Sequence, residues 1–113
     1  MQLKGNGFVY HYPADFDERA AIEMTDKGYV AGGSVEIAGK ARFPVAFFTP
    51  NRLRQELELA MDNGESVLAE EGLAIIAEIT PTAILRASEE LVNQHFFDHL
   101  KPLLSVVSNG AMR

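Results

Sequence analysis

The sequence predicts an α+β domain in which an antiparallel β-meander precedes two helices that pack on one face of the sheet. Apolar and polar residues alternate in segments 7–12 and 29–37, as they do in half-buried strands. Two apolar runs lead directly into Thr-Pro pairs, which begin at Thr49 and Thr80. A threonine cap followed by proline at the first helical position is a typical helix start. Strands followed by helices in this order are typical of the α+β class.

The strands are expected near residues 7–12, 29–37, 41–48 and 73–79. The first places Phe8 and Tyr10 on one face and Val9 and His11 on the other. The last is almost entirely apolar, so it is predicted to be the central strand, covered on both faces. Residues 65–70 are a candidate for a further short strand beside it.

Residues 20–37 admit two interpretations. Ile22 and Met24 alternate with polar neighbours, and Gly28 can take the positive φ of a turn, so a β-hairpin is the prediction. The alternative is a short helix over residues 17–24.

The helices are expected near residues 50–63 and 81–99. The first carries an apolar stripe at the helical spacing, formed by Leu53, Leu57, Ala60 and Met61. Leu59 falls about 240° round the helix from Leu53, so it lies outside this stripe.

Length and composition indicate one globular domain over residues 1–113, with 103–113 as a candidate C-terminal tail. The chain has no cysteine, which excludes disulfides and thiolate zinc sites. It also has no N-terminal apolar run followed by a cleavage site, so we expect a cytoplasmic protein. The longest apolar runs are far shorter than the ~20 residues of a membrane span, so no membrane partner is expected.

The net charge of −6 defines the partners that the sequence favours. A negative surface repels phosphate backbones, so nucleic-acid binding is not expected. The same field attracts basic proteins. The chain contains no glycine-rich phosphate loop, HExxH or GxSxG motif, and we expect no cofactor.

Two histidines and one glutamate are the candidates for catalysis or metal binding. His95 and His99 lie four residues apart in the second predicted helix, the spacing that lets two imidazoles reach one metal ion. Glu78 lies in an apolar strand just before a helix start, where burial would raise the pKa of a carboxylate toward that of a general base. The alternative is that all three are solvated or structural.

Arg52 and Arg54 are candidates for ligand binding at the start of the first helix. Cations there oppose the helix dipole, whose N-terminal end favours anions. They would be explained by a bound carboxylate or phosphate. The alternative is that they pair with Glu56 and Glu58.

The predicted helices carry more apolar surface than one sheet can cover. Leu59, Phe97 and Leu100 fall outside the core-facing stripes, and they are the predicted interface residues. The alternative is that the tail, residues 103–107, folds back over them.

We therefore expect a non-enzymatic acidic interaction module that forms a homo-oligomer or binds a basic partner, as an immunity or inhibitor protein does. The alternative function is a small-ligand-binding or metal-assisted enzyme that uses His95, His99 and Glu78.

Overall fold

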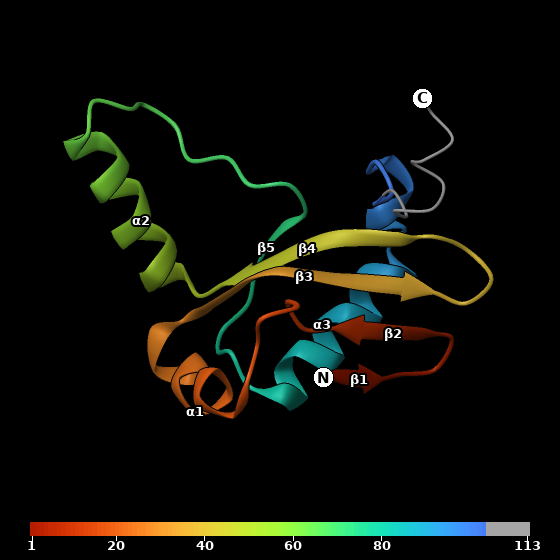
Figure 1. Ribbon diagram of the computed structural model, residues 1–113. Coiled ribbons are helices and arrows are strands. Elements are labelled where there is room, and N and C mark those ends of the chain that lie inside the picture. Colours follow the sequence, from red (N-terminus) through yellow and green to blue (C-terminus); the bar gives the residue numbers. More distant parts are fainter. Residues whose placement is uncertain (104–113) are drawn as a thin grey trace, which may run out of the picture.

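The structure is a computed structural model that describes residues 1–103 and contains a five-stranded sheet, three α-helices and a 3₁₀ helix (Figure 1). The strands are β1 (Gln2–Lys4), β2 (Phe8–His11), β3 (Tyr29–Ile37), β4 (Arg42–Phe48) and β5 (Leu73–Ile75). The helices are α1 (Glu18–Lys27), α2 (Pro50–Asp62), α3 (Pro81–Asn93) and the 3₁₀ helix η1 (Phe96–His99). The predicted α+β class is confirmed. The predicted tail beyond residue 103 lies outside the described residues.

The sheet has the strand order β1-β2-β3-β4-β5, and its first four strands are antiparallel neighbours. β5 instead runs parallel to β4 and lies at the edge of the sheet. A parallel neighbour requires a crossover connection, which here is α2 with residues 63–72. The prediction of a central strand over residues 73–79 was therefore wrong, and residues 65–70 form no strand.

Helix α1 replaces the first strand of the hairpin that was predicted over residues 20–37, so the alternative interpretation was correct there, whereas the expected second strand is present as β3. The Asp17 side chain accepts a hydrogen bond of 2.8 Å from the Ala20 N–H and caps the helix. Gly28 ends it in the left-handed conformation, with its N–H bonded to the Met24 carbonyl. These two caps outweigh the alternation around Ile22, which is an exposed residue of the helix.

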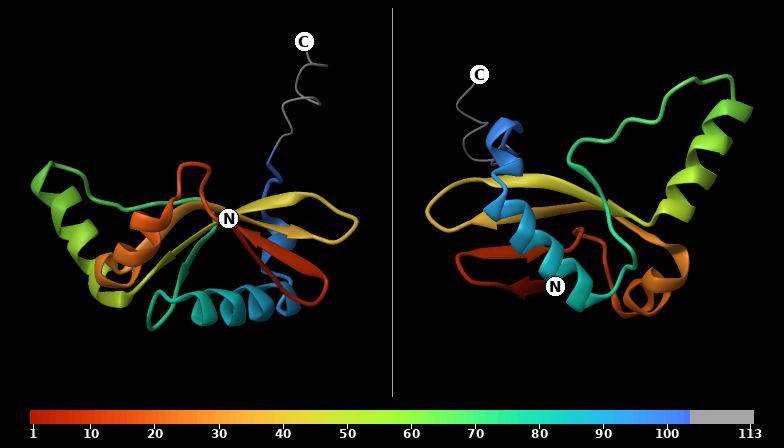
Figure 2. Two further views of the ribbon diagram at one scale, coloured as in Figure 1. Left: turned by 60° about the horizontal axis from the view of Figure 1, so that its bottom comes forward. Right: turned by 180° about the vertical axis from the view of Figure 1, so that it is seen from behind.

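The core lies between the sheet and α3, which covers one face of the sheet (Figure 2). Tyr10, Val35 and Phe47 of the sheet are fully buried there, as are Ile84 of α3 and Phe97 of η1. α1 contributes Met24 to the same core. Both Thr-Pro helix starts have the expected caps, because the side chains of Thr49 and Thr80 accept hydrogen bonds from backbone N–H groups three residues later.

The second predicted helix is shorter than expected and ends at Asn93 rather than near residue 99. His95 adopts a φ of 62°, in the left-handed region, and this residue stops the helix. The chain then turns into η1 and directs Phe97 into the core, against Phe43 and Phe96.

Helix α2 does not share a face of the sheet with α3, so that part of the prediction was wrong. It runs away from the end of β4 (Figures 1 and 2). Among the described residues, neither the main core cluster nor the partly buried side chains packed against it include a residue of α2, and Ala60 is the only buried residue of this helix. Leu53 and Leu57 of its apolar stripe instead line a groove that α2 forms with the crossover segment that returns to β5.

Candidate functional site

The candidate site is an apolar surface on α2 and the crossover segment that follows it. We call it the α2 surface, and it consists of Leu53, Leu57, Met61, Val67, Leu68, Leu73 and Ile75. The first three side chains share one helix stripe, because they are four residues apart. Leu73 and Ile75 share one face of β5, because they are two residues apart in a strand.

A groove runs through this surface between α2 and the crossover segment. Its volume is about 330 Å³, and five of the six residues that line it are apolar. The larger side chains around it are open to solvent: Leu57 is 38% exposed, Met61 60%, Val67 65% and Ile75 52%. A cluster of exposed apolar side chains of this kind marks a binding surface, whereas single exposed apolar residues are ordinary.

Arg52 is held by its own chain at the base of α2. Its guanidinium lies 4.4 Å from the centre of the Tyr29 ring and 2.8 Å from the Glu56 carboxylate, and it donates a hydrogen bond to the Lys27 carbonyl. These contacts anchor the start of α2 to α1 and β3. Tyr29 itself stacks on Phe48, the last residue of β4. The junction from which α2 projects is therefore a fixed one.

Arg54 points away from Arg52, because residues two apart lie on different sides of a helix. Its guanidinium donates to the Asn51 side chain at 2.6 Å and lies 3.8 Å from Glu58. The two arginines thus do not converge on one anion, although ligand binding by either of them stays a prediction. Their pairing with Glu56 and Glu58 agrees with the alternative interpretation.

The structure does not bring the predicted catalytic or metal-binding residues together. His95 lies at the helix stop and His99 at the end of η1, so they do not share one face of a helix turn. His95 instead lies 3.3 Å from Asp98, and both side chains are exposed. Glu78 is exposed in the connection between β5 and α3. Residues 1–103 contain no group of three His, Asp or Glu side chains that could hold a metal ion.

The predicted interface residues divide between the core and the surface. Phe97 is buried in the core, and Leu100 packs against that core. The prediction of an exposed interface residue was wrong for Phe97, because the chain turns at His95 instead of continuing as a helix, whereas Leu100 keeps part of its side chain exposed. Leu59 is 56% exposed on α2, on the side opposite the apolar stripe.

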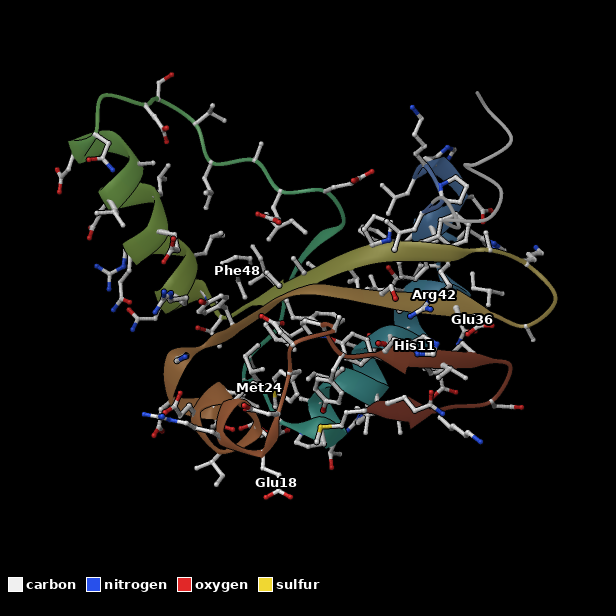
Figure 3. All side chains as sticks on the ribbon, viewed as in Figure 1. His11, Glu18, Met24, Glu36, Arg42 and Phe48 are labelled. Carbon is white, nitrogen blue, oxygen red and sulfur yellow. The ribbon has the colours of Figure 1, made fainter. Side chains whose placement is uncertain are left out.

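A polar cluster on the sheet was not predicted from the sequence (Figure 3). The His11 imidazole Nε2 and a Glu36 carboxylate oxygen are 2.7 Å apart across β2 and β3. Arg42 of β4 donates a hydrogen bond of 3.3 Å to the Ser34 hydroxyl. Strand alternation could have placed all four side chains on the face opposite Tyr10, but only strand register brings them together. Cross-strand pairs of this kind stabilise a sheet.

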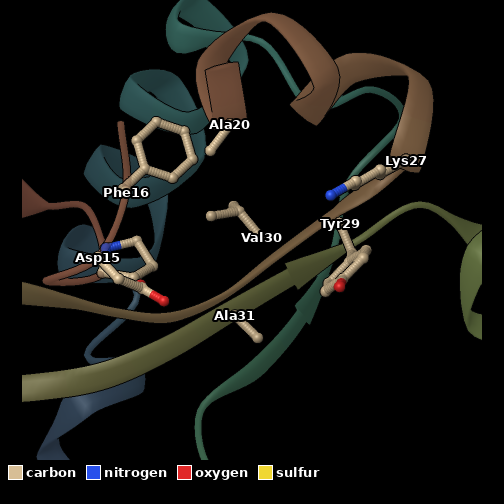
Figure 4. Close-up of a pocket in the computed structure, with 8 residues that line it drawn as sticks. Asp15, Phe16, Ala20, Lys27, Tyr29, Val30 and Ala31 are labelled. Carbon is tan, nitrogen blue, oxygen red and sulfur yellow. The ribbon is translucent and has the colours of Figure 1, made fainter. Parts of the chain in front are cut away.

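A small cleft lies between α1, β3 and the segment that precedes α1 (Figure 4). Its volume is about 170 Å³, and Asp15 and Lys27 lie on its two sides. Lys27 also lies 3.2 Å from Glu23. The lining includes neither histidine nor serine, so the cleft offers no nucleophile with an adjacent imidazole base.

Comparisons with protein families, with curated proteins and with solved structures find no match for this chain. No helix in residues 1–103 is long and apolar enough to cross a membrane.

Proposed function

We propose that the protein is an interaction module that acts by binding, and that it self-associates through the α2 surface. The observation that carries this proposal is the position of α2. The helix is fixed at its start by Arg52, yet among the described residues its apolar stripe adds no side chain to the main core cluster, and Ala60 is the only stripe residue that is buried. An amphipathic helix gains most of its stability by packing that stripe, so α2 needs a partner surface.

A second copy of the chain supplies a matching apolar surface without any further component. Burying one Leu or Met side chain stabilises by roughly 1.5–3 kcal/mol, and a two-fold interface counts each such contact twice. The net charge of −6 on each copy opposes association in general. Apolar contact therefore has to provide most of the affinity.

The test is sedimentation velocity at micromolar concentrations with the wild-type protein and Met61→Asp. The wild type is expected to be a dimer. Met61→Asp places a charge on the apolar stripe of the α2 surface, so its association should be at least about tenfold weaker. Met61 is 60% exposed and lies outside the core, so circular dichroism should show an unchanged fold.

Leu59→Asp is the matched control. Leu59 lies on the same helix and is 56% exposed, but it projects from the opposite side. It should leave the dimer unchanged. A monomeric wild type would contradict self-association. A dimer that Leu59→Asp dissociates and Met61→Asp does not would place the interface on the other side of α2.

A further inference from the structure

We infer that the two copies pair through antiparallel α2 helices, so that the first half of each helix lies beside the second half of the other. This inference rests on the proposed self-association and adds its geometry. The observations that carry it are the distribution of charge along α2 and the position of those charges relative to the apolar stripe.

Charge is segregated along α2 in the order that disfavours an isolated helix. The first half carries Arg52 and Arg54, and the second half carries Glu56, Glu58 and Asp62. The first turn has no acidic residue and the last turn has no basic one, so both ends oppose the helix dipole. An antiparallel neighbour makes this charge distribution favourable, because each basic half then lies beside an acidic half. The two helix dipoles are also antiparallel, so the positive end of each lies beside the negative end of the other.

Arg54 and Glu58 occupy the flank of the apolar stripe. Counting about 100° per residue from Leu53, Met61 lies at roughly 80°, Arg54 at 100° and Glu58 at 140°. Both charged side chains are therefore at the rim of the α2 surface, and both are more than half exposed. Their mutual distance of 3.8 Å marks a weak surface pair that either residue can exchange for another partner.

A two-fold axis near Leu57 satisfies both the apolar and the charged contacts. In an antiparallel pair of symmetric helices, each flank meets the same flank of the partner in reverse order. Leu57 then packs on Leu57 of the second copy, and Leu53 lies opposite Met61. Arg54 of each copy lies beside Glu58 of the other.

The test uses charge reversal at Arg54 and Glu58 and measures association by sedimentation. Arg54→Glu and Glu58→Arg each place like charges together at two sites in the dimer, so each should weaken association by about tenfold. The double variant Arg54→Glu/Glu58→Arg restores complementary charges and should return the affinity to within about threefold of wild type.

An equimolar mixture of the two single variants separates contacts between copies from contacts within one helix. Each single variant retains its like-charge pair within the helix, but in a mixed dimer the contacts between copies are complementary again. We expect heterodimers to form preferentially, which native mass spectrometry detects. If the wild type is a dimer and neither single reversal weakens association, antiparallel pairing is overturned and self-association still holds. A monomeric wild type would remove both.

Discussion

At the residue scale, Tyr10 and Gly33 form a contact that sequence patterns could not identify. The Tyr10 side chain is fully buried, and its hydroxyl has no hydrogen-bond partner among the described residues. A Cβ at position 33 would overlap that hydroxyl, so β3 needs glycine there. The register of β3 against β4 shifts between Val30 and Gly33, so the strand is irregular at this glycine.

Tyr10→Phe is expected to raise the free energy of unfolding by about 1 kcal/mol, because it removes a buried hydroxyl that has no partner. Urea denaturation measures this change. Gly33→Ala should lower the free energy of unfolding by about 1–3 kcal/mol, because the added methyl group overpacks the core. That loss should be smaller in the Tyr10→Phe background, and equal losses in both backgrounds would show that the hydroxyl is not what crowds Gly33.

Tyr10 also makes the stability of the fold depend on pH in the alkaline range. Burial is the larger cause that raises the pKa of Tyr10 above its ordinary value of 10.0, and the neighbouring Tyr12 is the smaller one. The folded state therefore holds this proton more tightly than the unfolded chain does. The resulting stability is complete below about pH 10 and is lost as the pH rises toward the folded pKa. The free energy of unfolding, measured at about pH 8 and pH 11, should be lower at pH 11. This difference should be smaller in Tyr10→Phe. Burial also raises the pKa of Tyr12, so part of the decrease should remain.

At the element scale, the helix starts could be predicted and one of the helix ends could not. Thr49 and Thr80 cap as expected, because a cap depends only on residues within one turn. The end of α3 depends on a histidine with positive φ, for which no local pattern exists. Phe97 decides that end, since the core gains a phenylalanine only if the chain turns at His95.

His95→Gly tests this account of the helix stop. Glycine adopts positive φ without the steric cost that other residues have, so the variant should be about 1 kcal/mol more stable by urea denaturation. His95→Val should be less stable than wild type, because a β-branched side chain is strained at this φ. Both variants lose the contact with Asp98, but that contact is exposed, so its loss has little effect on the stability of either variant. If valine were tolerated as well as glycine, His95 would not be the residue that sets the end of α3.

At the scale of the whole molecule, the sequence predicted the apolar stripe of α2 but not what it packs against. Periodicity identifies which side chains share a face, and it is the same for a stripe that meets the sheet and for one that faces solvent. The crossover to a parallel β5 decides between the two, and it depends on strand pairing across residues 46–75. The predicted interface at Phe97 was wrong for the same reason, because burial is a property of the tertiary fold.

The position of α2 also predicts how local stability depends on protein concentration. Among the described residues α2 adds no side chain to the main core cluster, so in the monomer it should open at a lower free energy than α3. Association binds only the folded helix and should therefore stabilise α2 as concentration rises. Hydrogen exchange followed by mass spectrometry should show protection of residues 50–62 that increases with concentration in the wild type. It should not increase in Met61→Asp.

Helix α1 is the internal control for that measurement. It contributes Met24 to the core and lies outside the α2 surface, so its local openings leave a dimer intact. Where the amides of residues 18–27 exchange through such local openings, their protection should stay constant over the same concentrations. Equal increases in both helices would mean that association stabilises the whole fold at once. In that case α2 would not open independently, and an element that lies outside the core would still be coupled to it, through the Arg52 and Tyr29 contact at its base.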